Sequence, residues 1–107
     1  MAFEVLELSI QLCRALRAPL ERLRQHDRDL YDQAKRDANG IALSLSESRR
    51  RAGKDRLHLL RIGAGSADEV RTALRCAQAW GYLEDAATAE PLELLDRIQA
   101  MLWRLTH

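Results

Sequence analysis

The chain has 107 residues, 47% of them hydrophobic, and a net charge of +1, which predicts one domain with its own core and excludes a polycation. No apolar run approaches the roughly 18 residues that cross a bilayer, and the acidic N-terminus is a poor signal peptide. We therefore expect a cytoplasmic protein without a membrane partner. Cys13 and Cys76 lie within helical patterns and are expected to be buried thiols. No Cys and His spacing predicts a metal site, and no motif predicts a cofactor.

Four helices are predicted, and no strand pattern is present. The first helix covers about residues 3–16. Pro19 then ends or kinks it near Ala18, because proline lacks the N–H that an interior position of a helix needs. Leu20 and Leu23 can continue into a second short turn.

The second and third helices are the longest. The second covers residues 27–51, with Asp27 as its N-terminal cap and Gly53 as a candidate C-terminal cap. The third covers about residues 54–80 and is followed by Gly81, where a left-handed cap is expected. Their apolar stripes predict the core, and the small residues on both helices predict close contact. The stripes are Leu30, Ala34, Ala38, Ile41 and Leu45, and Leu57, Leu60, Ala64, Ala67, Val70, Leu74 and Ala77; the small residues include Gly40, Gly63, Gly65 and Ser66.

The fourth helix begins at Thr88 or Glu90, with Pro91 tolerated in its first turn. Short connections make neighbouring helices antiparallel, so residues 1–107 are predicted to form a single all-α domain, an up-down four-helix bundle. Apolar residues beyond one stripe on the first and fourth helices favour self-association. The candidates for that interface are Trp80, Tyr82 and Trp103.

Positive charge is densest between residues 49 and 61, where Asp55 is the only acid. One interpretation is a solvated turn whose cations favour the C-terminal end of a helix. The other is a patch that contacts the phosphates of a nucleic acid. Aromatic residues are scarce, so backbone contact is expected rather than sequence-specific reading of single strands. The candidate residues are Arg49, Arg50, Arg51, Lys54, Arg56 and Arg61.

Residues 33–83 resemble, without a gap, the bacterial family of proteins encoded in intervening sequences of large-subunit ribosomal RNA. That family includes Avd, the accessory protein of diversity-generating retroelements. The pattern G-S-x-x-E-x-x-T, here residues 65–72, is its most specific part. The positions that match are Gln33, Arg36, Ala38, Ile41 and Glu47, and then Leu59, Leu60, Ile62, Gly65, Ser66, Glu69, Thr72, Leu74, Ala77, Gly81 and Tyr82. The departures are Asp37 for Ala, Ala42 for Pro, Ser44 for Asn and Ser48 for Gly.

The resemblance implies a four-helix bundle that assembles into a ring, typically a homopentamer, in the cytoplasm. It also implies no known catalytic activity. In Avd-like relatives the ring has a basic surface and works with nucleic acid and a reverse transcriptase.

Three charged residues match the family pattern: Arg36, Glu47 and Glu69. A catalytic carboxylate pair needs a raised pKa and a nearby nucleophile or water, and nothing in the sequence supplies that context. We therefore interpret Glu47 and Glu69 as structural partners of Arg36, or of other arginines on adjacent helices or subunits. Asp37 is expected at the edge of the apolar stripe, solvated or paired with an arginine.

The function expected from the sequence is non-enzymatic. We expect a small homo-oligomer, a pentamer as the resemblance implies, that binds RNA or DNA through residues 49–61. The alternative is a protein-binding or structural module without nucleic-acid binding, for which the acidic residues 84–96 are an equally suitable docking surface.

Overall fold

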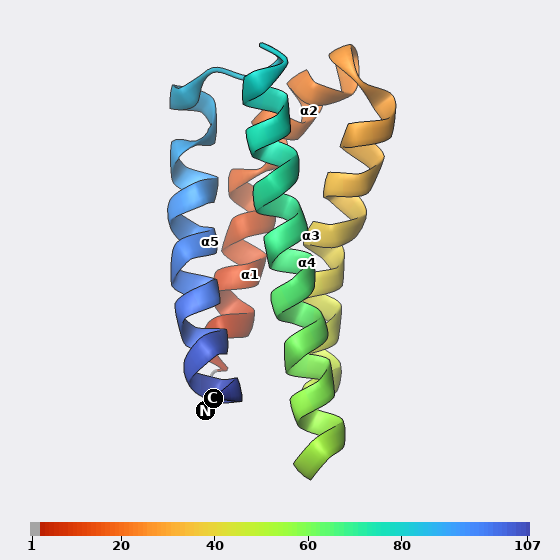
Figure 1. The fold of residues 1–107 in the computed structure, drawn as a ribbon, viewed down its shortest axis with the longest axis vertical. Coiled ribbons are helices and arrows are strands. Elements are labelled where there is room, and N and C mark those ends of the chain that lie inside the picture. Colours follow the sequence, from red (N-terminus) through yellow and green to blue (C-terminus); the bar gives the residue numbers. More distant parts are fainter. Residues whose placement is uncertain (1–2) are drawn as a thin grey trace.

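The computed structural model describes residues 3–107, which form five α-helices and no strand (Figure 1). The all-α class is confirmed, although the sequence predicted four helices. α1, α3, α4 and α5 each pack against two of the others, and α2 packs mainly on α3. The helices are α1 (Glu4–Ala15), α2 (Arg17–His26), α3 (Arg28–Ser48), α4 (Gly53–Ala79) and α5 (Asp85–Thr106).

The additional helix arises at Leu16, where the chain bends between α1 and α2. The prediction that Pro19 ends or kinks the first helix near Ala18 is wrong in position, because α1 already ends at Ala15 and Pro19 lies in the first turn of α2. A proline is tolerated there because the first-turn N–H groups have no partner within the helix. The expected short turn after Pro19 is therefore part of a ten-residue helix.

The caps that were predicted for the two long helices are largely confirmed. The Asp27 carboxylate accepts a hydrogen bond from the Leu30 N–H at 2.9 Å, which satisfies one first-turn donor of α3. Gly81 has a φ of +81°, and the Tyr82 N–H donates to the Ala77 carbonyl at 2.9 Å, as in a left-handed C-terminal cap. Gly53 also has a positive φ, +58°, but it begins α4 rather than capping α3.

α5 begins at Asp85, earlier than the predicted start at Thr88 or Glu90. The Thr88 hydroxyl is buried inside the first turns, where it donates to the Asp85 carbonyl at 3.1 Å and accepts from the Gln78 amide at 2.7 Å. Thr88 therefore connects α5 to α4 through this hydrogen bond and is not the N-terminal cap of α5. Pro91 lies beyond the first turn, inside the helix.

The core lies where the apolar stripes of α3 and α4 meet, and α1 and α5 complete it. The predicted stripes are confirmed except at Leu30, Leu57 and Ala64, which are half-buried. α3 and α4 approach closely at two glycines. A Cβ at Gly40 would lie 3.2 Å from the Ser66 Oγ, and one at Gly63 would lie 3.4 Å from a Leu45 methyl. Gly65 faces open space, so it has no part in this contact.

Large apolar side chains remain exposed on every helix except α2 in the described part of the chain. Surplus apolar surface was predicted on the first and last helices, where Ile10, Trp103 and Leu105 are exposed; Leu43 on α3 and Ile62 on α4 add to it. Within residues 3–107, no helix is long and apolar enough to cross a membrane.

Replacement of Leu74 by Asp is expected to unfold the protein. Leu74 is fully buried, and an unpaired carboxylate there costs several kcal/mol, out of a total stability of about 5–15 kcal/mol. The matched control is Leu43→Asp, at a side chain that is 69% exposed. Far-UV circular dichroism during urea unfolding compares the two. A folded Leu74→Asp variant would contradict the core assignment.

Candidate nucleic-acid interface

Six cationic side chains lie around the turn between α3 and α4, and we call them the basic end. They are Arg49, Arg50, Arg51, Lys54, Arg56 and Arg61, and all are exposed except the half-buried Arg56. Figure 1 shows this turn beyond the ends of α1 and α5. Solvent therefore surrounds the turn on several sides, and the cations are presented at one extremity of the molecule.

Most of the basic end has no carboxylate partner. Arg51 pairs with Glu47, with 2.9 Å between Nη2 and Oε1, and the Arg49 guanidinium lies 5.8 Å from the centre of the Phe3 ring. Apart from Arg51, the five cations of the basic end form no ion pair with any of residues 3–107. Their charge is therefore available to a polyanion, and guanidinium groups match the geometry of phosphate oxygens.

The ion pairs that were predicted between Arg36 and the acids Glu47 and Glu69 are not the ones that the structure shows. Glu47 pairs with Arg51 at the end of its own helix, and Arg36 donates to the Gln33 side chain at 3.3 Å. Among residues 3–107, Arg36 forms no ion pair with Glu47 or Glu69. Pairing between subunits stays a prediction.

Glu69 on α4 instead faces another acid, Asp37 on α3. A hydrogen bond with Asp37 and its negative charge raise the pKa of Glu69 above the ordinary 4.5, and the charge of Asp68 adds to this. Asp37 is buried rather than at a solvated edge, and it accepts from the Gln33 amide at 2.8 Å, not from an arginine. This is a carboxyl pair between the two closest helices.

The three aromatic interface candidates do not form one cluster, because Trp103 lies apart from the other two. Trp80 and Tyr82 lie in the connection before α5, where their rings stack at 6.3 Å and His26 stacks on Tyr82 at 5.1 Å. Trp103 lies near the other end of α5, roughly 27 Å away along the helix axis. Trp80 and Trp103 are 70% and 63% exposed, whereas Tyr82 is half-buried.

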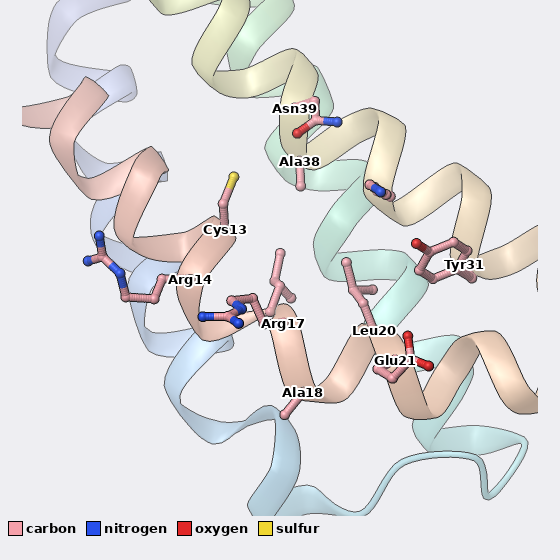
Figure 2. Close-up of a pocket in the computed structure, with 11 residues that line it drawn as sticks. Cys13, Arg14, Arg17, Ala18, Leu20, Glu21, Tyr31, Ala38 and Asn39 are labelled. Carbon is pink, nitrogen blue, oxygen red and sulfur yellow. The ribbon is translucent and has the colours of Figure 1, made fainter.

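A groove of about 730 Å³ opens between α1, α2 and α3 (Figure 2). Cys13, Leu20 and Ala38 border it with apolar surface, and Arg14 and Arg17 with charge. The groove includes Leu16, where α1 gives way to α2, and the sequence pattern predicted one helix and a short turn here without such a groove. Pro19 is the residue in the sequence that indicates an interruption of the helix here.

The two cysteines differ in environment. Cys13 is half-buried beside the groove, and burial raises the pKa of its thiol, which keeps it protonated and unreactive. Cys76 is exposed on α4, so the expectation of two buried thiols is wrong for Cys76.

A family model described as "23S rRNA-intervening sequence protein" matches residues 1–104. The chain belongs to this family. The resemblance that the sequence analysis found in residues 33–83 is thereby confirmed and extends over nearly the whole chain. The family description states no catalytic activity.

A solved structure shares the fold of this family member. It is a protein of unknown function from the S23 ribosomal protein family of Bacteroides thetaiotaomicron VPI-5482, determined at 1.70 Å resolution. The TM-score is 0.84 at 16% sequence identity, and the match covers 95% of this chain and 97% of the other. No curated protein sequence matches significantly.

Replacement of Glu69 by Gln is expected to stabilise the protein at pH 7. Because the pKa of Glu69 is raised in the folded state, its contribution to stability is present below the ordinary value of 4.5 and is lost as pH rises through the raised value. The amide keeps a donor for Asp37 and removes the repulsion. Urea midpoints should therefore favour the variant at pH 7 and converge with wild type near pH 4.

The control for this comparison is Glu93→Gln on α5, because Glu93 is exposed and forms no ion pair among residues 3–107. Equal pH dependence in the two variants would show that the Asp37 carboxyl does not oppose Glu69.

Proposed function

We propose that this protein is a non-enzymatic adaptor that binds the backbone of RNA or DNA through the basic end. The observation that carries the proposal is the group of five cations without a carboxylate partner among residues 3–107 at one extremity of the molecule. Lys and Arg bind phosphates by charge and hydrogen bonding, without reading sequence. The descriptions of the family and of the S23 neighbour refer to ribosomal RNA and to a ribosomal protein family, which is compatible with such a role.

We further propose that the chain works in the cytoplasm as a ring-like homo-oligomer, with a homopentamer as the expected state. Each subunit would be an up-down four-helix bundle of α1, α3, α4 and α5, with α2 as part of the connection. Exposed apolar side chains such as Leu43 and Trp80 support self-association. Five basic ends on one ring would present roughly thirty cations, and multivalent contact raises affinity without new interactions at each site.

The second candidate is a protein-binding or structural module that does not bind nucleic acid. One observation favours it: the exposed acids Glu84 and Asp85 follow closely after Trp80, which is 70% exposed. An exposed tryptophan beside a charged rim is typical of protein interfaces. The acidic residues 84–96 would then be the docking surface.

Binding of oligonucleotides is expected to weaken with salt and with removal of the basic end. The test variant is Arg49/Arg50/Lys54→Ala. The control is Arg22/Arg75/Arg97→Ala, which removes the same charge from three exposed arginines that form no ion pair among residues 3–107. Fluorescence anisotropy at low salt should show about tenfold weaker binding for the test variant, with a shallower salt dependence.

The control variant should bind like wild type. An equal loss in both variants would mean that net charge alone governs binding. Absence of binding by wild type at low salt would contradict the proposal and leave the protein-binding module as the function to test.

Light scattering is expected to give a mass near 60 kDa, about five copies of the 12.2 kDa chain. The measurement is made at micromolar protein concentration, at which specific apolar contacts between copies should keep the oligomer assembled. A mass near that of one chain would contradict the oligomer.

A further inference from the structure

A second feature lies beside the basic end, between α4 and α5. It is a hollow of about 340 Å³, and Arg61 of the basic end lines it. The residues that matter here are Arg61, Gly65, Asp68, Gln99, Trp103 and His107. A cation, an aromatic ring and polar groups therefore border the same space, although they come from distant parts of the chain.

Trp103 is the aromatic wall of this hollow. His107 stacks on it, with 3.4 Å between the ring centres and 17° between their planes. Even with this ring against it, Trp103 is 63% exposed. An indole that stays largely open to solvent beside a cation is a suitable platform for another flat ring.

The polar side of the hollow is held in place by a network across the two helices. The Gln99 amide donates to the Asp68 carboxylate at 3.2 Å, and its oxygen accepts from two guanidinium nitrogens of Arg71 at 2.7 and 3.0 Å. Arg71 also pairs with Asp96. Asp68 keeps a second carboxylate oxygen, which can accept a hydrogen bond from the N–H edge of a base but would repel a phosphate.

The floor of the hollow is open because Gly65 has no side chain. A Cβ at this position would meet no atom within 4 Å, so close packing of the protein does not require glycine here. The absent side chain leaves room above α4 for a ligand to approach the backbone.

We propose that this hollow receives an unpaired base of a single-stranded nucleic acid. The base stacks on Trp103, its polar edge faces Asp68, and Arg61 contacts a neighbouring phosphate. This inference rests on the proposed function, to which it adds a preference for single strands. A paired base in a duplex cannot offer its face to a side chain without leaving the stack, so the hollow discriminates against duplexes.

The test uses the Trp80→Phe variant, in which Trp103 is the only tryptophan. A mixed-sequence ten-nucleotide single strand and the duplex of the same sequence are titrated at low salt, and both Trp103 emission and oligonucleotide anisotropy are recorded. We expect the single strand to quench Trp103 with the same midpoint as the anisotropy change. The duplex should bind through the basic end with little quenching.

The companion variant is Trp103→Ala, which should retain its circular dichroism spectrum because the side chain is largely exposed. Its affinity for the single strand should fall about tenfold, the scale of one base stacking on an aromatic ring, with no change for the duplex. The matched control is Trp103→Phe, which keeps an aromatic ring at this position for a base to stack on and should leave both affinities nearly unchanged.

The outcomes separate the two proposals. If neither nucleic acid binds, the proposed function fails and this inference fails with it. If both bind, Trp103 emission is unchanged and Trp103→Ala binds like wild type, the base site alone is overturned. If Trp103 emission changes with protein concentration but not with nucleic acid, Trp103 lies between copies of the chain, which also overturns the base site.

Discussion

The close packing of α3 against α4 is the constraint on which the rest of the molecule depends. The two helices approach at Gly40 and Gly63, where a Cβ would lie 3.2 Å and 3.4 Å from a side-chain atom of the other helix. Half of the buried apolar residues on these two helices are alanines, and such small side chains let the helices lie close together. α1 and α5 then cover the remaining apolar edges of this pair. The basic end is placed by the same contact, since it is the turn that joins the two helices.

The carboxyl pair of Asp37 and Glu69 lies at this constrained contact. The hydrogen bond with Asp37 and its negative charge raise the pKa of Glu69, so each acid opposes the ionisation of the other. The packing of α3 on α4 stabilises an arrangement that is electrostatically unfavourable at neutral pH. Among residues 3–107, Glu69 forms no ion pair with the arginines that the sequence predicted as its partners.

The sequence predicted the elements whose signals are local and periodic. The stripes of α3 and α4, the Asp27 cap and the Gly81 cap depend on short spacings, and all are present apart from three half-buried positions of the stripes. The bend at Leu16 and the start of α5 were missed because Pro19 and Thr88 each fit two positions in a helix. Tertiary contacts choose between those positions, as the bond from Gln78 to Thr88 shows.

For the candidate site, too, the sequence predicted the features that are local in the chain and not those that depend on distant contacts. The six cations of the basic end could be listed from the sequence because they are consecutive or nearly so. That five of them have no carboxylate partner among residues 3–107 follows only from side-chain distances within the structure. Arg61 and Trp103 line the same hollow because α5 packs along α4, and no spacing in the sequence predicts this. The groove beside Cys13 likewise depends on the angle between α1 and α2.

The short connection between α3 and α4 has a consequence for the order of folding. Only four residues separate Ser48 from Gly53, so closing this loop costs little chain entropy. Contacts between elements that are adjacent in sequence form earliest, because less of the chain has to be ordered before they are made. We therefore expect the helical hairpin of α3 and α4 to form first, with its cationic turn displayed before α1 and α5 dock.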